Sequence, residues 1–119
     1  MEIKAFKPGQ TVYIMGTDRR DRGDHAARKA EVAKVGRKYV TISGRWGERF
    51  RGTVGRSKPY LIEEMEYGSP RLLFPSEAAV MEYKEREELK EWVRRATDWD
   101  KVDRYTIEQL RAVKQILEG

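Results

Sequence analysis

The loop between residues 17 and 29 holds the carboxylate and imidazole groups that most resemble a chemical site. Asp18, Asp21, Asp24 and His25 are close in sequence, and such groups can bind a divalent cation. Arginines at positions 19, 20 and 22 interleave with them, and their positive charge opposes a bound cation. We therefore expect a solvated, ion-paired loop and no metal site.

Catalytic motifs are equally sparse. His25 is the one histidine, and no nucleophile or second acidic motif is fixed beside it in the sequence. Gly52, Gly55 and Lys58 do not have the Gly-x-x-x-x-Gly-Lys spacing that cradles a phosphate. We predict that the chain is not an enzyme and that it needs no cofactor.

The stretch 36–52, GRKYVTISGRWGERFRG, combines basic and aromatic side chains between glycines. Arg and Lys neutralise phosphates, and aromatic rings stack on unpaired bases. The predicted partner is nucleic acid, RNA or DNA, and the alternative is a host protein with an acidic surface. The predicted binding residues are Tyr13, Arg37, Lys38, Tyr39, Arg45, Trp46, Arg49, Arg51 and Arg56.

The charge distribution supports an anionic partner. Residues 1–59 carry 15 Lys/Arg and 6 Asp/Glu, whereas residues 60–119 carry 10 and 14, within a total net charge of +5. The first half is therefore basic and the second mildly acidic, which is typical of a surface that meets a polyanion. Attraction between the two halves of one folded chain is the alternative explanation.

Elements that would position these side chains follow from hydrophobic periodicity. The first half predicts about five short strands, in which Val12, Ile14, Val40, Ile42 and Phe50 face inward. The strands are expected at 11–16, 29–35, 38–43, 48–54 and 60–67, with a short apolar run at 71–74.

The second half predicts two helices. Ser76 is a suitable N-cap for a helix that reaches about Ala96, and Thr106 with Gln109 forms a capping box for the next. The first apolar stripe, expected to be core, is Ala78, Met81, Leu89, Trp92, Val93 and Ala96. The second stripe is Ile107, Leu110, Val113, Ile116 and Leu117.

Together these elements indicate an α+β fold. We expect a small β-barrel over residues 1–75 and a helical hairpin over 76–119, packed on it as one compact unit. The charged residues of the first helix are expected to form ion pairs one turn apart, such as Glu82–Arg86 and Glu91–Arg95.

Two sequence patterns carry a family resemblance. Phe6-x-Pro8-Gly9-Gln10-x-Val12-Tyr13-Ile14 and the later run Ala30 to Ile42 resemble SH3-like β-barrels. The segment KVGRKYVTI, the Leu73-Phe74-Pro75-Ser76 step and the closing helix 106–118 resemble small β-barrel proteins of bacteriophages and other mobile elements. The resemblance implies a phage-type binding protein, because SH3-like barrels serve many binding roles.

Three functions therefore stay open at this point. The favoured one is a non-catalytic protein that binds nucleic acid through a basic barrel face. The second is an anti-defence inhibitor, such as an anti-CRISPR, which binds a host protein through arginine anchors. The third is a structural protein that self-assembles through its helices.

The expected location is the cytoplasm of the host cell. The sequence has no cysteine, no apolar run of the ~18–20 residues that span a bilayer, and no apolar core of a signal peptide. We therefore expect no membrane partner.

Overall fold

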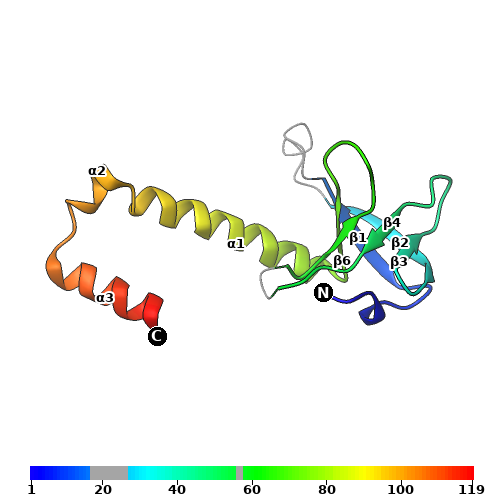
Figure 1. The fold of residues 1–119 in the computed structure, drawn as a ribbon, viewed down its shortest axis with the longest axis horizontal. Helices are drawn as coiled ribbons and strands as arrows, with labels where there is room; N and C mark the ends of the chain where they lie inside the picture. The colour runs from blue at the N-terminus through cyan, green and yellow to red at the C-terminus, as the bar shows by residue number, and fades with distance from the viewer. Residues whose placement is uncertain (17–26, 56–57) are drawn as a thin grey trace. The chain divides into compact units, whose positions relative to one another are not determined.

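A computed structural model describes residues 1–16, 27–55 and 58–119 of the chain. It divides into two compact units, Met1–Tyr83 and Lys84–Gly119. The first unit contains a closed antiparallel barrel in which each strand pairs with the next and the sixth pairs with the first (Figure 1). The strands are β1 Thr11–Met15, β2 Arg28–Val35, β3 Tyr39–Ile42, β4 Arg49–Arg51, β5 Leu61–Glu63 and β6 Leu72–Phe74, preceded by a 3₁₀ turn, Ile3–Ala5.

The barrel confirms the expected α+β fold, with one difference in strand number. The short apolar run 71–74, which was not counted among the predicted strands, contains β6, which pairs with β5 and with β1. All three residues of β6 are buried, so the strand has no alternation of buried and exposed side chains that the sequence could reveal. Closure through β6 leaves the sheet without an unpaired edge, which a five-stranded sheet would have exposed.

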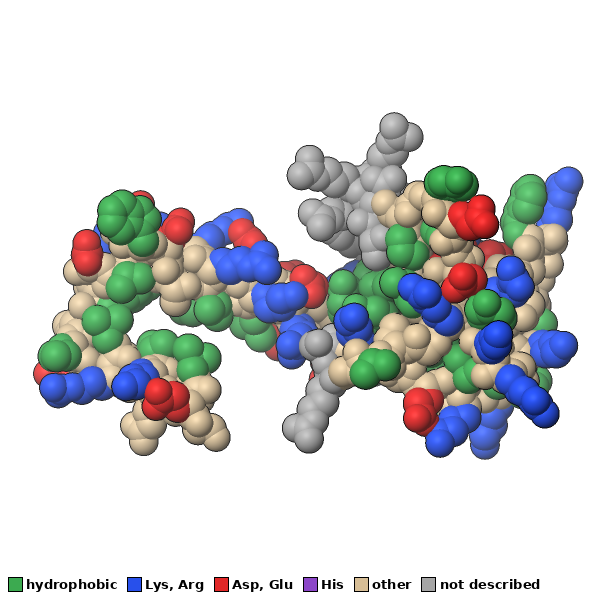
Figure 2. Space-filling view, viewed as in Figure 1, with side chains coloured by type: hydrophobic (Ala, Val, Ile, Leu, Met, Phe, Trp, Pro, Cys, Tyr) green, Lys and Arg blue, Asp and Glu red, His purple; other side chains and the backbone are tan. Residues whose placement is uncertain are grey.

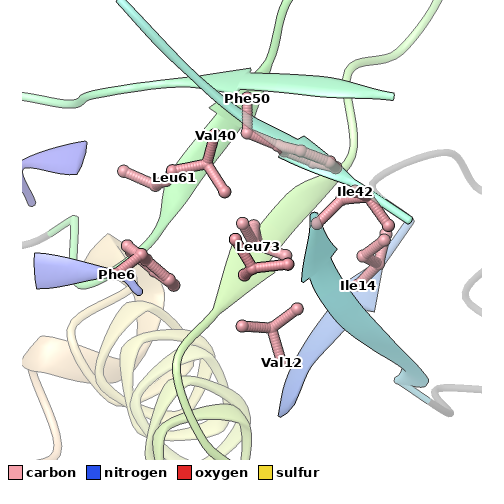
Figure 3. Close-up of a cluster of buried hydrophobic side chains, with 9 residues drawn as sticks. Phe6, Val12, Ile14, Val40, Ile42, Phe50, Leu61 and Leu73 are labelled. Atoms are coloured by element: carbon pink, nitrogen blue, oxygen red, sulfur yellow. The ribbon is translucent and has the colours of Figure 1, made fainter. Parts of the chain in front are cut away.

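The barrel core confirms the inward positions read from the alternation. Val12, Val40 and Phe50 are completely buried, and Ile14 and Ile42 nearly so. Figure 3 shows these side chains converging inside the barrel together with Phe6, Leu61 and Leu73. Large apolar side chains without polar atoms fill this space, so it is a packed core and not a ligand cavity.

The first helix, α1 Glu77–Ala96, begins where the sequence predicted. The Ser76 hydroxyl accepts a hydrogen bond from the Ala79 backbone N–H at 3.2 Å, which satisfies one free donor at the helix start. Its first turns belong to the barrel unit, where Val80 is buried against Leu72 and Phe74. Tyr83 adds an aromatic contact, with its ring centroid 5.3 Å from that of Phe74.

The prediction that the apolar stripe of α1 is core was wrong. Ala78 is exposed, Met81 is 63% exposed, and Leu89, Trp92 and Val93 are also exposed. The residues that pack are Ala79, Val80 and Tyr83. The face of α1 that carries Tyr83 packs against the small apolar cluster at β6. Tyr83 was not part of the predicted stripe.

The second unit contains the end of α1, a short helix α2 Trp99–Val102 and the helix α3 Ile107–Glu118. The Thr106–Gln109 capping box is present: each residue accepts a hydrogen bond from the backbone N–H of the other, at 2.9 and 3.1 Å. Of the two predicted ion pairs on α1, Glu91–Arg95 forms at 3.3 Å. The expected packing of the helices on the barrel stays a prediction.

Within the described ranges, no helix combines the length and the apolar character that crossing a bilayer requires.

Candidate nucleic-acid interface

The outer face of β3 and β4 carries the centre of the predicted binding surface. Tyr39 pairs with Arg51 across the two strands, and Thr41 pairs with Arg49, while the alternate residues Val40 and Phe50 point into the core. The Arg49 guanidinium carbon lies 4.9 Å from the centroid of the Tyr39 ring. This cation–π contact holds a planar cation against an aromatic ring on the barrel surface.

The turn between β3 and β4 presents a second pair of the same kind. The Arg45 guanidinium carbon lies 5.3 Å from the Trp46 ring centroid, and Trp46 is 79% exposed. Gly44 and Gly47 flank the pair with φ angles of +134° and +53°, which other residues rarely adopt. The glycines therefore permit a tight turn that leaves the indole ring in solvent.

A residue that the sequence reasoning missed joins this surface from β2. The pairing of β2 with β3 shifts between Val32 and Lys34, so that Lys34 lies opposite Thr41 and Val35 opposite Val40. Strict alternation would have placed Lys34 on the inward side with Val32. The irregularity instead turns Lys34 outward, where it is exposed. The spacing of Val32 and Val35, three residues apart in a strand, is the one sequence signal that indicates it.

Lys34, Thr41 and Arg49 consequently form one row across three adjacent strands. Arg37 and Lys38 are exposed in the turn at one end of β3, and Arg45 and Trp46 lie in the turn at the other end. The surface runs the length of β3, which is ~13 Å for four residues. We call these residues the basic face: Lys34, Arg37, Lys38, Tyr39, Arg45, Trp46, Arg49 and Arg51.

Figure 2 shows Lys and Arg side chains gathered over the side of the barrel unit where β2, β3 and β4 lie. Within residues 1–16, 27–55 and 58–119, the one ion pair formed by a basic-face cation joins Arg51 to Glu64 at 3.6 Å. Glu31 is an exposed carboxylate on β2, the strand that also carries Lys34. Most of the positive charge is therefore not neutralised by the described part of the barrel.

One predicted binding residue does not join the basic face. Tyr13 is half-buried and packs against the cluster of Leu72, Phe74 and Val80, because its strand pairs with β2 and β6 and not with β3. Arg56 lies outside the described residues. The same holds for the loop carboxylates and His25, so the expectation for that loop stays a prediction.

Four other charged residues form a network at one end of the barrel, where β2, β4 and β6 begin and β5 ends. Glu63, only 9% exposed, accepts hydrogen bonds from the Arg71 side chain at 2.7 and 3.0 Å. Glu48 accepts from Arg28 at 2.7 Å and lies 3.3 Å from Arg71. These carboxylates are thus already paired with arginines.

The Glu63 carboxyl has a lowered pKa. Its hydrogen bonds from Arg71 favour the charged form, and they outweigh the opposing effect of burial. A general acid at neutral pH needs the opposite, a pKa raised toward 7. The network therefore has the character of a structural ion pair that fastens β5 to β6.

No group of three or more His, Asp or Glu side chains in the described ranges is arranged to hold a metal ion. The groups of the basic face are suited to binding and not to catalysis. Guanidinium and ammonium groups can contact phosphates, and two aromatic rings, each in contact with an arginine, can stack on bases.

Comparison with known proteins adds one match. The family model described as Phage ProQ C-terminal-like domain matches residues 1–119. Searches of curated proteins and of solved structures gave no match.

Proposed function

The chain belongs to the family of phage ProQ C-terminal-like domains, and from this premise we propose that it is a non-catalytic protein that binds nucleic acid through the basic face. The observation that carries the proposal is the row of Lys34, Thr41 and Arg49, with Arg49 stacked on Tyr39. This row and the Tyr39 ring bring cations and an aromatic group together on one surface of the barrel.

The phosphate part of the interaction rests on the cations of the basic face, of which Arg51 is also paired with Glu64. Each Lys or Arg that contacts a phosphate releases condensed counterions, so binding weakens as salt rises. Six cations make up the basic part of this face. If all six contact phosphates of a single strand, the logarithm of the binding constant falls against the logarithm of salt with a slope of about −4.

The base part of the interaction rests on Trp46 and Tyr39. Rings that are exposed on a surface stack with bases only where the bases are not already stacked in a duplex. Trp46 is 79% exposed and therefore open to such contact. We propose unpaired segments of RNA or DNA as the preferred ligand, over a continuous duplex.

A binding titration tests this proposal. A fluorescent single-stranded oligonucleotide of about 16 nucleotides is titrated with the protein at several salt concentrations, and anisotropy is recorded. The variant Arg45→Ala/Arg49→Ala removes two cations from the basic face. The matched control Arg94→Ala/Arg95→Ala removes two cations from α1, so the change in net charge is equal.

The expected result is tenfold or greater weakening for the basic-face variant, a shallower salt slope, and little change for the control. Equal weakening in both variants would reduce the effect to net charge and contradict a defined site. Absence of binding to single-stranded or duplex RNA and DNA at low salt would overturn the proposal. A protein partner captured from host lysate after nuclease treatment would then favour the anti-defence alternative.

A further inference from the structure

The helical unit Lys84–Gly119 contains an apolar groove that the proposed function does not use. It has a volume of about 530 Å³ and lies between the end of α1, α2 and α3. Figure 2 shows it as a hollow bordered by hydrophobic side chains. The large residues that line it include Trp92, Val93, Leu110, Val113, Ile116 and Leu117.

The groove has almost no free polar group to offer a small ligand. Thr97 donates its hydroxyl proton to the Val93 carbonyl at 2.7 Å, and Gln109 uses its side-chain oxygen in the capping box of α3. Small-molecule sites usually add a few well-placed polar groups to an apolar pocket. The lining of this groove is almost entirely apolar, which favours an apolar protein surface as its occupant.

Most large apolar side chains of this unit are not buried within it. No residue of α2 or α3 is buried, and Ile116 and Leu117 are 76% and 77% exposed. Helices of this length derive most of their stability from covering an apolar face. The unit therefore resembles one half of a helical bundle that lacks its other half.

We propose that the other half is a second copy of this chain. Two copies pair through their helical units, and each places the apolar face of its α3 in the groove of the other. The result is a bundle formed by the α1 ends and α3 helices of two chains. Each copy supplies both a groove and a helix to fill one, as a two-fold interface requires.

The available area agrees with this pairing. Trp92, Val93, Tyr105, Leu110, Val113, Ile116 and Leu117 have exposed fractions that together equal about four fully exposed large side chains. At ~150–250 Å² for a large side chain, this is on the order of 800 Å². A specific interface buries about 800 Å² per partner, so the pairing reaches that size if it covers these seven side chains entirely, on the helix faces as well as in the groove.

The charge of the unit also favours a second copy over an anionic partner. Residues 84–119 carry nine Lys/Arg and nine Asp/Glu, which leaves no net charge, whereas residues 1–83 carry the whole excess of +5. A neutral unit does not repel its own copy. It also lacks the excess of Lys and Arg with which amphipathic helices bind anionic membranes.

The test is the mass of the intact chain in solution, measured by sedimentation equilibrium from a few micromolar to several hundred micromolar. We expect a shift from 14.0 kDa to twice that mass as concentration rises. Ile116→Glu and Leu117→Glu each introduce a charge into the groove, and each is expected to raise the dimer dissociation constant at least tenfold. Both side chains are already exposed, so the variants are expected to keep the barrel fold.

Gln115→Glu is the matched control, because Gln115 is an exposed residue of the same helix that neither lines the groove nor belongs to its apolar stripe. It is expected to dimerise as the unmodified chain does. A monomer at every concentration would overturn the proposal, whatever else fills the groove. A dimer that Ile116→Glu and Leu117→Glu leave intact would overturn it too, because the interface would lie elsewhere. Neither result depends on nucleic-acid binding, so the two proposals can fail separately.

Discussion

Trp46 is the residue on which the proposed stacking interaction depends most. Stacking of a base on an aromatic side chain contributes ~1–3 kcal/mol, so Trp46→Ala is expected to weaken binding of a single-stranded oligonucleotide about 5- to 150-fold. Because the side chain is 79% exposed, the stability of the barrel is expected to stay unchanged. Anisotropy titration and urea unfolding measure the two quantities.

The chain supplies its own control for this substitution. Trp99 is 87% exposed but lies at the start of α2, in the other unit. Trp99→Ala is expected to leave affinity for the oligonucleotide unchanged. Similar losses from both tryptophan variants would contradict a role specific to the basic face.

Glu63 links stability to pH. Its pKa is lowered in the folded state by the hydrogen bonds from Arg71, so the folded protein holds the proton less tightly than the unfolded chain does. The stabilisation is therefore fully present above the ordinary pKa of 4.5 and is lost as pH falls through the folded value. We expect the free energy of unfolding to decrease as pH is lowered below about 4.5.

The variant Glu63→Gln isolates this contribution. It removes the charge that faces Arg71 inside a largely buried pair and is expected to cost about 1–3 kcal/mol at pH 7. The difference from the unmodified chain is expected to narrow as pH falls below 4.5, because Glu63 itself then becomes protonated. Urea unfolding at pH 7 and at a series of acidic pH values measures it, with Glu66→Gln at an exposed position as control. A pH-independent difference would contradict the linkage.

At the scale of elements, the irregularity in β2 decides which side chains reach the basic face. It turns Lys34 toward Thr41 and Arg49, although the alternation from Val32 predicts the opposite side. Lys34→Glu is therefore expected to weaken oligonucleotide binding at least tenfold by anisotropy, because it replaces a cation in the row with an anion. The stability of the barrel is expected to change little, since Lys34 is exposed.

Arg94→Glu gives the same change of two charge units on α1 and serves as control. If Lys34 pointed inward, as regular alternation implies, Lys34→Glu would not affect binding selectively. Loss of folding in that variant would then contradict the position that the structure gives to this residue.

The starts of the two longer helices were predictable from hydrogen bonds between residues close in sequence. Ser76 caps α1 through a contact three residues away, and Thr106 with Gln109 forms its box within a single turn. The buried face of α1 was not predictable in the same way. Whether Met81 or Tyr83 packs depends on Phe74 and Tyr60, which lie in other strands or connections of the barrel unit.

At the scale of the whole molecule, the two units differ in how complete their cores are. The barrel unit encloses a buried cluster of nine apolar residues, whereas α2 and α3 have no buried residue. A shortened chain of residues 1–88, which keeps the packed start of α1, is therefore expected to unfold cooperatively. The peptide 84–119 is expected to gain helix content only as its concentration rises, because its apolar face is covered by a second copy.

Circular dichroism with urea unfolding measures both expectations. A shortened chain that fails to fold would show that residues 89–119 contribute to the stability of the barrel unit. Concentration-independent helix content in the peptide would contradict the need for a second copy.

The sequence by itself determined the properties that depend on neighbours in the chain. Alternation placed Val12, Ile14, Val40, Ile42 and Phe50 in the core, and the caps set the helix starts. It also placed the basic charge in the first half of the chain. Each of these follows from interactions over a few residues, which a linear sequence displays directly.

Only the tertiary structure decided which distant residues meet. Barrel closure by β6, the outward turn of Lys34 and the separation of Tyr13 from Tyr39 all depend on strand pairing and register. Register is a property of two strands together, and a shift of one residue exchanges the inner and outer faces. No single stretch of sequence contains that information, so the residues that make up the basic face could be identified only from the paired strands of the barrel.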